Sequence, residues 1–181
     1  PIPDLPPVIT TPSGIIQEAT SANGAVVTFS ASATDPEDGP VSVTCTPPSG
    51  STFPLGITTV VCTATDSVGN TGSGMFNIQI VDTTPPTAPS GLTATAISSS
   101  RIDLSWSVSY DAVGVSTYWI FRSLDGTSFI PIGSGAITTF SNNGLLPNTT
   151  YYYLIVAYDA AGNPSTISNI ASAKTPQQPP N

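Results

Sequence analysis

Apolar residues alternate with polar ones in short runs along the whole chain, a period of two that is typical of strands with one buried face. In the first half this alternation gives four runs of inward positions. They are Val27, Phe29, Ala31; Val41, Val43, Cys45; Val60, Cys62, Ala64; and Phe76, Ile78, Ile80. Clusters of Gly, Pro, Ser and Thr separate the runs and indicate turns.

The second half shows the same alternation. Its inward positions are Leu92, Ala94, Ala96; Ile102, Leu104, Trp106; Tyr118, Ile120; and Tyr151, Tyr153, Ile155, Ala157. The 19 Pro and 15 Gly residues among 181 argue against helices, because both residue types destabilise a helix interior. The fold class is therefore predicted to be all-β.

A proline-rich segment between Asp82 and Ser90 divides the chain. Closely spaced prolines cannot donate hydrogen bonds to a sheet and hold the backbone extended. Each side of the segment has the size of a β-sandwich. We predict two β-sandwiches in tandem joined by a short Pro-rich linker, with the following parts: a first domain at 1–81, the linker at 82–90, a second domain at 91–176 and a Pro-rich tail at 177–181.

Two motifs in the first half are Val27-Thr-Phe-Ser-Ala-Ser-Ala-Thr-Asp35 and Val61-Cys-Thr-Ala-Thr-Asp-Ser-Val-Gly-Asn70. With them, residues 6–81 resemble the HYR (hyalin repeat) family, an immunoglobulin-like extracellular module. Both Cys45 and Cys62 occupy inward positions, which allows either a disulfide or two buried thiols. The resemblance implies that they pair, and a disulfide requires a compartment outside the reducing cytosol.

The second half contains Leu104-Ser-Trp106, Asp111-Ala-Val-Gly-Val-Ser-Thr-Tyr118 and Leu145-Leu-Pro-Asn-Thr-Thr-Tyr151. On these motifs, residues 86–176 resemble a fibronectin type III domain of the bacterial or archaeal secreted kind. The resemblance places Tyr151 at the tyrosine corner of that fold. Together the resemblances imply two immunoglobulin-like β-sandwiches in tandem and an extracellular or cell-surface location, and neither implies a reaction.

Charge and composition exclude several classes of function. The chain has no histidine and only two cysteines, which removes Ser-His and Cys-His catalysis and the usual zinc sites. Its net charge of −8 makes nucleic acids and anionic membranes poor partners. The longest strongly apolar run, at 151–158, is much shorter than the roughly 18 residues that span a bilayer. We therefore expect a protein that is not an enzyme.

Carboxylates are predicted to gather at one end of each sandwich, because two loops and the incoming chain share that end in both sandwich types. Residues 1–82 contain no Lys, Arg or His, so no salt bridge within that half can relieve the repulsion. A hard cation with oxygen ligands, above all Ca²⁺, would do so. The alternative is a set of solvated acidic loops. The candidate ligands are Asp82, Asp111 and Asp159 in the second group and, on weaker grounds, Asp4, Asp35 and Asp66 in the first.

Three aromatic residues of the second half are predicted to face outward on neighbouring strands, namely Trp119, Phe121 and Tyr152. We expect a contact surface for a neighbouring subunit or for a polysaccharide, with the subunit favoured, and the alternative is ordinary surface partly covered by Arg122. The tripeptide Asn148-Thr-Thr is a sequon for N-glycosylation, although it also fits a plain turn.

These features favour a non-enzymatic extracellular structural or adhesion unit of a prokaryotic surface or secreted protein. It would act as a stalk spacer, an adhesin segment or a subunit of a surface filament, with other copies or neighbouring repeats as partners. The alternative is an accessory region of a secreted polysaccharide-degrading enzyme, because fibronectin type III domains often accompany such catalytic domains. Catalysis by the carboxylates themselves ranks third, because the paired acids of a glycosidase must flank a cleft.

Overall fold

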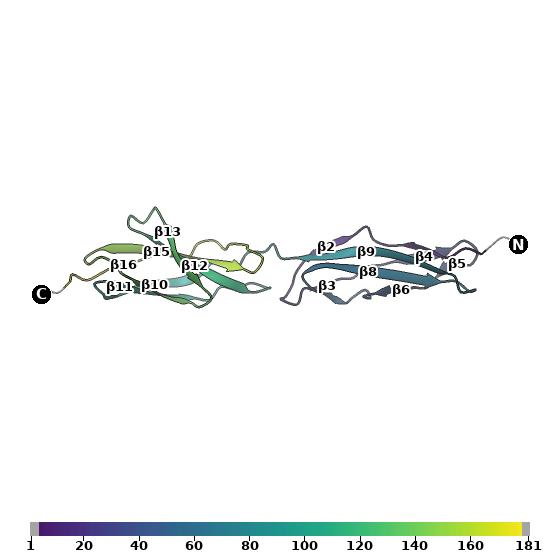
Figure 1. Cartoon of the computed structure of the whole chain (residues 1–181), viewed down its shortest axis with the longest axis horizontal. Coiled ribbons are helices and arrows are strands. Elements are labelled where there is room, and N and C mark those ends of the chain that lie inside the picture. Colours follow the sequence, from purple (N-terminus) through teal and green to yellow (C-terminus); the bar gives the residue numbers. More distant parts are fainter. Residues whose placement is uncertain (1–3, 179–181) are drawn as a thin grey trace. The chain divides into compact units, whose positions relative to one another are not determined.

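The computed structural model describes residues 4–178, which form two compact units that divide between Asp82 and Thr83 (Figure 1). All regular elements in the described residues are strands, and the predicted all-β class is confirmed. Residues 1–3 of the predicted first domain and residues 179–181 of the predicted tail lie outside the described part.

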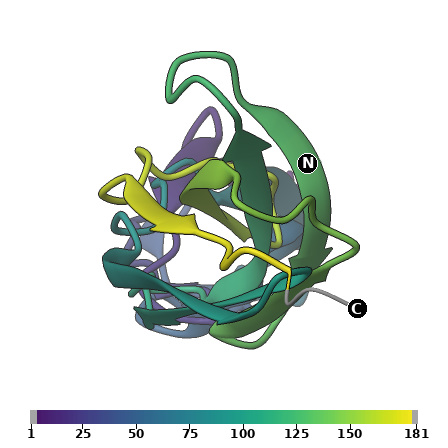
Figure 2. The same cartoon turned by 90° about the vertical axis from the view of Figure 1, so that its left-hand side faces the viewer.

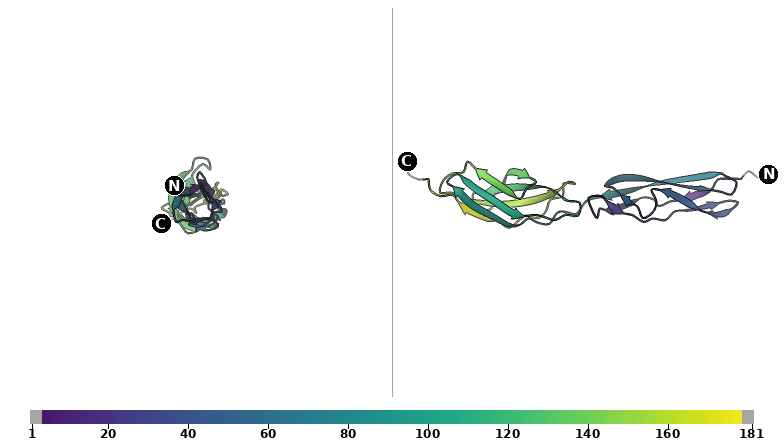
Figure 3. Two further views of the ribbon diagram at one scale, coloured as in Figure 1. Left: turned by 90° about the vertical axis from the view of Figure 1, so that its right-hand side faces the viewer. Right: turned by 90° about the horizontal axis from the view of Figure 1, so that it is seen from below.

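Within residues 4–82, unit 1 contains nine strands in three sheets. The strands are β1 (Val8–Thr10), β2 (Ile15–Glu18), β3 (Ala25–Val26), β4 (Ser32–Asp35), β5 (Gly39–Val41), β6 (Val43–Thr46), β7 (Thr52–Phe53), β8 (Gly56–Thr65) and β9 (Thr71–Val81). The sheets have the orders β2-β9-β8-β6, β1-β4-β5 and β3-β7. The long antiparallel pair of β8 and β9 dominates the four-stranded sheet, which the right panel of Figure 3 shows from below.

The core of unit 1 lies on one face of β8 and β9. Val60, Cys62, Phe76, Ile78 and Ile80 alternate with exposed residues and are 6% exposed or less, as the sequence pattern predicts. Each such side chain gains roughly 1.5–3 kcal/mol from burial. The two strands therefore carry much of the packing of the unit.

The predicted strand at 27–31 is wrong, because these residues pair with a turn instead of a strand. The Val27 N–H donates to the Ser51 carbonyl at 3.1 Å, and the Phe29 N–H donates to the Ser49 hydroxyl at 2.8 Å. Val27 is nonetheless 1% exposed, so its inward position holds. The strand expected at 41–45 is split at Ser42, since β5 and β6 belong to different sheets.

The described part of unit 2, residues 83–178, contains seven strands in two sheets, and Figure 2 views its two layers from one end. The sheet orders are β10-β11-β14 and β13-β12-β15-β16. The strands are β10 (Ser90–Ser98), β11 (Arg101–Ser107), β12 (Val115–Ser123), β13 (Ile130–Gly135), β14 (Thr139–Asn143), β15 (Thr150–Asp159) and β16 (Ala171–Lys174). All pairings within these two sheets are antiparallel.

The inner faces of these two sheets enclose the core of unit 2. Trp106 of β11 meets Tyr118 of β12 edge to face, with ring centroids 5.6 Å apart. The hydroxyl of Tyr151 accepts the backbone N–H of Leu146 at 2.9 Å, which is the hydrogen bond of a tyrosine corner. The three-plus-four arrangement and this corner agree with the resemblance to fibronectin type III domains.

Candidate functional site

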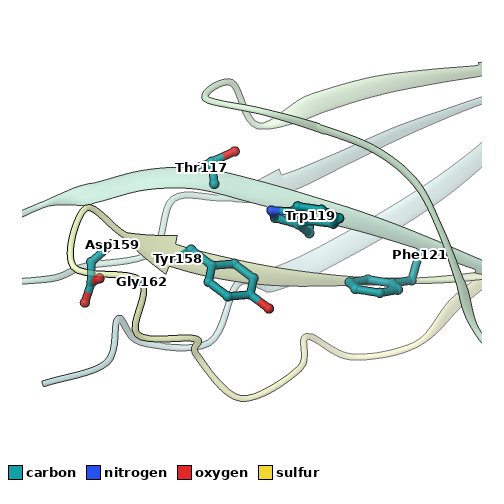
Figure 4. A pocket seen from close by; sticks show the side chains of 6 residues that line it. All are labelled: Thr117, Trp119, Phe121, Tyr158, Asp159 and Gly162. Atoms are coloured by element: carbon teal, nitrogen blue, oxygen red, sulfur yellow. The ribbon is translucent and has the colours of Figure 1, made fainter. Parts of the chain in front are cut away.

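A shallow groove on the outer face of the four-stranded sheet of unit 2 is the strongest candidate for a binding site. We call it the aromatic groove. Figure 4 shows the rings of Tyr158, Trp119 and Phe121 following one another over β12 and β15. The residues that line it are Thr117, Trp119, Phe121, Tyr158, Asp159 and Gly162.

The alternation of β12 sets the three outward side chains of this strand. Tyr118 and Ile120 point into the core and are 3% and 2% exposed, so Thr117, Trp119 and Phe121 point away from it. On β15, Tyr158 lies opposite Thr117 in the strand register. Two neighbouring strands therefore supply the same surface.

The rings of Trp119 and Tyr158 lie beside each other on this surface. Their ring centroids are 6.3 Å apart and their planes are tilted by 56°. Trp119 is 40% exposed, although Val156, its neighbour on β15, is only 9% exposed. Large aromatic residues in water on a sheet face usually mark a contact site.

The structure places two of the three predicted interface residues in the aromatic groove. Trp119 and Phe121 line it, whereas Tyr152 does not. Tyr152 packs instead beside the turn at Gly126. A Cβ added to this glycine would lie 3.5 Å from the Tyr152 ring. The sequence analysis missed Tyr158, although its position six residues after Tyr152 on the same strand gives it the same outward direction.

Asp159 ends β15 in a turn that its own carboxylate holds. Its Oδ1 accepts the Asn163 backbone N–H at 2.9 Å, and its Oδ2 accepts the Asn163 side-chain amide at 2.7 Å. In unit 1, the carboxylate of Asp66 accepts the backbone N–H and side-chain amide of Asn70 in the same way. The two turns share a sequence pattern, Ala-x-Asp-x-x-Gly-Asn.

Asp111 holds the loop that leads into β12. Its Oδ1 accepts the backbone N–H groups of Val113 and Gly114, each at 2.8 Å. Its Oδ2 is buried and has no hydrogen-bond partner among the described residues. Within unit 2, a carboxylate oxygen of Asp111 lies within 4.8 Å of one of Asp159, which is the spacing of ligands around one cation.

Asp35 occupies the corresponding loop of unit 1 and is only 2% exposed. Its Oδ1 accepts the backbone N–H groups of Glu37 and Asp38, while its Oδ2 is buried without a partner among the described residues. Among the described residues, Asp4, Asp35 and Asp66 do not come together as a group of three that could hold one cation. The loops of Asp35 and Asp111 thus share their hydrogen-bond geometry.

Two carboxylates of unit 1 have displaced pKa values. Burial raises the pKa of Asp4, and the negative charges of Asp66 and Glu37 raise it further. Burial alone would also raise the pKa of Asp66, but hydrogen bonds from the Asn70 side chain and from three backbone N–H groups lower it overall. Asp66 is therefore held as a carboxylate by its turn.

Cys45 and Cys62 form a disulfide, as predicted. They lie directly opposite each other on β6 and β8, so the bond joins neighbouring strands of one sheet. Asn148 is exposed at the turn before β15 with a φ of 52°, and its backbone N–H donates to the Pro176 carbonyl at 3.1 Å. The side chain of the sequon is therefore accessible.

Residues 4–80 match the HYR domain family. The chain is also 44% identical to Chitinase A1 of Niallia circulans over 94 residues, which are 52% of this chain and 13% of that protein. It is 36% identical to Exoglucanase B of Cellulomonas fimi over 98 residues, which are 52% of this chain and 8% of that protein. The chain thus spans a small part of these curated relatives.

Among solved structures, the chain is similar to domains A168–A170 of titin, with a TM-score of 0.53 and 14% sequence identity. The match covers 96% of this chain and 68% of the titin fragment. At this identity it supports the fold alone, that is, immunoglobulin-like sandwiches in series. Within residues 4–178, the structure has no helix that could cross a membrane.

Proposed function

We propose that this chain, an HYR domain followed by a fibronectin type III domain, is a non-enzymatic accessory region of a secreted protein that degrades polysaccharides. The observation that carries the proposal is the similarity to Chitinase A1, which is 44% over a stretch that makes up only 13% of that protein. A stretch this small within a much larger enzyme is the size of an accessory domain. The match to Exoglucanase B likewise covers only a small part of that protein, 8% of its length.

The geometry of the aromatic groove supports a role without catalysis. Glycosidases place two carboxyl groups about 5–9.5 Å apart on either side of the bond they cleave. Asp159 is the one carboxylate among the described residues that line the groove. Both of its oxygens already accept hydrogen bonds from Asn163, so it serves its own turn.

The disulfide supports an extracellular location. Cys45 and Cys62 are the only cysteines in the chain, and their bond persists only in an oxidising compartment. A polysaccharide-degrading protein that is secreted meets this condition. The disulfide of unit 1 would then remain formed outside the cell.

A second candidate function is a structural or adhesion unit, such as a stalk spacer or a filament subunit. The match of residues 4–80 to the HYR domain family favours it, because that half resembles an extracellular module and not an enzyme. In this role, copies or neighbouring repeats would be the partners. The two candidates differ in whether a polysaccharide or another protein is bound.

A fusion experiment tests the accessory role. The whole chain is joined to a polysaccharide hydrolase that has no accessory domain, and hydrolysis of insoluble chitin and cellulose is compared with hydrolysis of soluble oligosaccharides. We expect a severalfold gain on the insoluble substrate alone, since an accessory region acts by holding the enzyme at the solid. Equal rates with and without the chain on both kinds of substrate would refute the accessory role.

A further inference from the structure

We propose that the aromatic groove of unit 2 binds a neutral polysaccharide chain, with Trp119 as its central stacking platform. This inference rests on the proposed function and names the class of ligand and the residues that meet it. A pyranose ring presents a face of C–H groups and an edge of hydroxyl groups. The groove offers the complementary chemistry, which is a row of rings with polar groups beside them.

The outward residues of β12 span the length of a short oligosaccharide. Thr117, Trp119 and Phe121 are spaced two apart on this strand, which spans about 13 Å of extended backbone. Tyr158 on the neighbouring strand widens the row beside Trp119, with 6.3 Å between the two ring centroids. Figure 4 shows these three rings on one side of the two strands.

The residues of β15 beside two of the rings are buried. On β15, Leu154 and Val156 lie opposite Phe121 and Trp119 in the register and are 7% and 9% exposed. They lie on the outer face of the sheet, yet the side chains around them cover them. Trp119 and Phe121 are therefore flanked by buried neighbours and would lose little conformational freedom when a ligand binds.

Polar groups beside the rings are available to sugar hydroxyls. Within residues 4–178, the indole N–H of Trp119 and the hydroxyl of Tyr158 make no hydrogen bond to another protein group. Thr117 adds a hydroxyl whose contact to the Gly135 carbonyl is long, at 3.4 Å. A bound sugar chain could pair with all three groups without breaking a short hydrogen bond of the sheet.

The charge of the groove favours a neutral ligand. No Lys or Arg is among the described residues that line it, and the whole chain carries a net charge of −8. An acidic polysaccharide or a phosphate would meet repulsion without a compensating cation. Neutral glucans and chitin carry no charge that this surface would repel.

The size of the groove argues against a second protein as its occupant. A stable protein interface takes roughly 20–30 residues from each side. Six residues line the groove, and three of them are aromatic. A small surface of which half the residues are aromatic fits a narrow chain lying on a few rings better than it fits a flat protein surface. We therefore propose a polysaccharide as the occupant, in place of the subunit that the sequence favoured.

The test is binding of soluble hexasaccharides of the chitin, cellulose and starch series to the purified 181-residue chain. Tryptophan fluorescence reports it directly, because Trp106 is buried at 6% exposure whereas Trp119 is 40% exposed. We expect at least one hexasaccharide to change the fluorescence and Trp119→Ala to weaken its affinity, measured by calorimetry, on the order of tenfold or more. Trp119→Phe, which keeps a ring, should retain part of the affinity.

Tyr110→Ala is the matched control, because Tyr110 belongs to the same unit, is 73% exposed and does not line the groove. It should bind as the parent does. Binding of no hexasaccharide, or equal binding by the parent and Trp119→Ala, overturns the proposal. Self-association of the parent that Trp119→Ala abolishes also overturns it and assigns the groove to a second copy.

The outcomes separate this site from the accessory role. A fusion that gains activity on insoluble substrate while Trp119→Ala binds normally would keep the accessory role and refute the site. A fusion without gain, combined with sugar binding that depends on Trp119, would keep the site and refute the accessory role.

Discussion

The hydroxyl of Tyr151 accepts the backbone N–H of Leu146 at 2.9 Å and so closes the turn that precedes β15. Tyr151 is 4% exposed, and its ring lies 5.3 Å from the guanidinium carbon of Arg122. The same side chain thus packs in the core of unit 2 and fixes the loop that contains Asn148.

We expect Tyr151→Phe to lower the free energy of unfolding of the chain by about 1 kcal/mol or more, because the Leu146 N–H loses its partner while the packing of the ring is retained. Urea unfolding followed by circular dichroism measures this difference. Tyr152→Phe is the matched control, since the Tyr152 hydroxyl makes no hydrogen bond within the described residues. A loss of equal size in both variants would contradict the role of the corner.

The disulfide between Cys45 and Cys62 should stabilise unit 1 in particular. The two residues are 17 positions apart, and closing a loop of this length contributes about 3 kcal/mol in the chain-entropy model. We expect reduction to lower the urea midpoint of unit 1. Unit 2 contains no cysteine and serves as an internal control, so its unfolding, reported by the fluorescence of Trp106, should not change. An unchanged midpoint for both units after verified reduction would contradict this expectation.

Asp66 should make unit 1 sensitive to acid. The folded state lowers the pKa of Asp66 below its ordinary value of 3.8, because Asn70 and backbone N–H groups bind the charged form. Its contribution to stability is therefore present above 3.8 and is lost as the pH falls through the lower folded pKa. In Asp66→Asn, an amide replaces the Oδ2 that accepts the Asn70 side chain.

We expect Asp66→Asn to be less stable than the parent at neutral pH, and this difference to shrink as the pH is lowered past 3.8. Urea midpoints of both proteins over this pH range measure it. A difference that stays constant down to strongly acidic pH would show that the charge of Asp66 contributes nothing.

Strand alternation predicted much of the fold because most strands have one buried face. Val60, Cys62 and Ala64 are inward in the structure as in the pattern. Phe29 lies outside any strand because the Ser49 hydroxyl satisfies its backbone N–H, and a period of two cannot reveal a bond to a side chain 20 residues away.

The candidate groove shows a similar limit. Alternation gives the face of each aromatic residue but not what covers it. Tyr152 and Tyr158 share the outward direction on β15, and only the structure shows that the turn at Gly126 packs against Tyr152. Trp119 was found from the sequence because it alternates with Tyr118 and Ile120, which are buried in the structure. The approach of Asp111 to Asp159 followed from the loop order of the sandwich, which the sequence does predict.

The acidic group of unit 2 leads to the last prediction, which is that Asp111 and Asp159 bind Ca²⁺. Asp111 has a buried Oδ2 without a hydrogen-bond partner among the described residues, and a carboxylate oxygen of Asp159 lies within 4.8 Å of one of its oxygens. Two carboxylates this close repel each other, and a cation with oxygen ligands would remove that cost. We expect added CaCl₂ to raise the thermal midpoint of unit 2 and EGTA to lower it.

Asp111→Asn is the sharpest variant for this test. Its side-chain oxygen can still accept the N–H groups of Val113 and Gly114, so the loop should keep its form while the charge is lost. The repulsion from Asp159 falls at the same time, so the variant should be at least as stable as the parent in EGTA and should gain less from CaCl₂ than the parent does. Calorimetric titration with CaCl₂ measures the affinity directly. If the parent takes up no Ca²⁺ and its midpoint is the same in CaCl₂ and EGTA, these carboxylates only shape their loops.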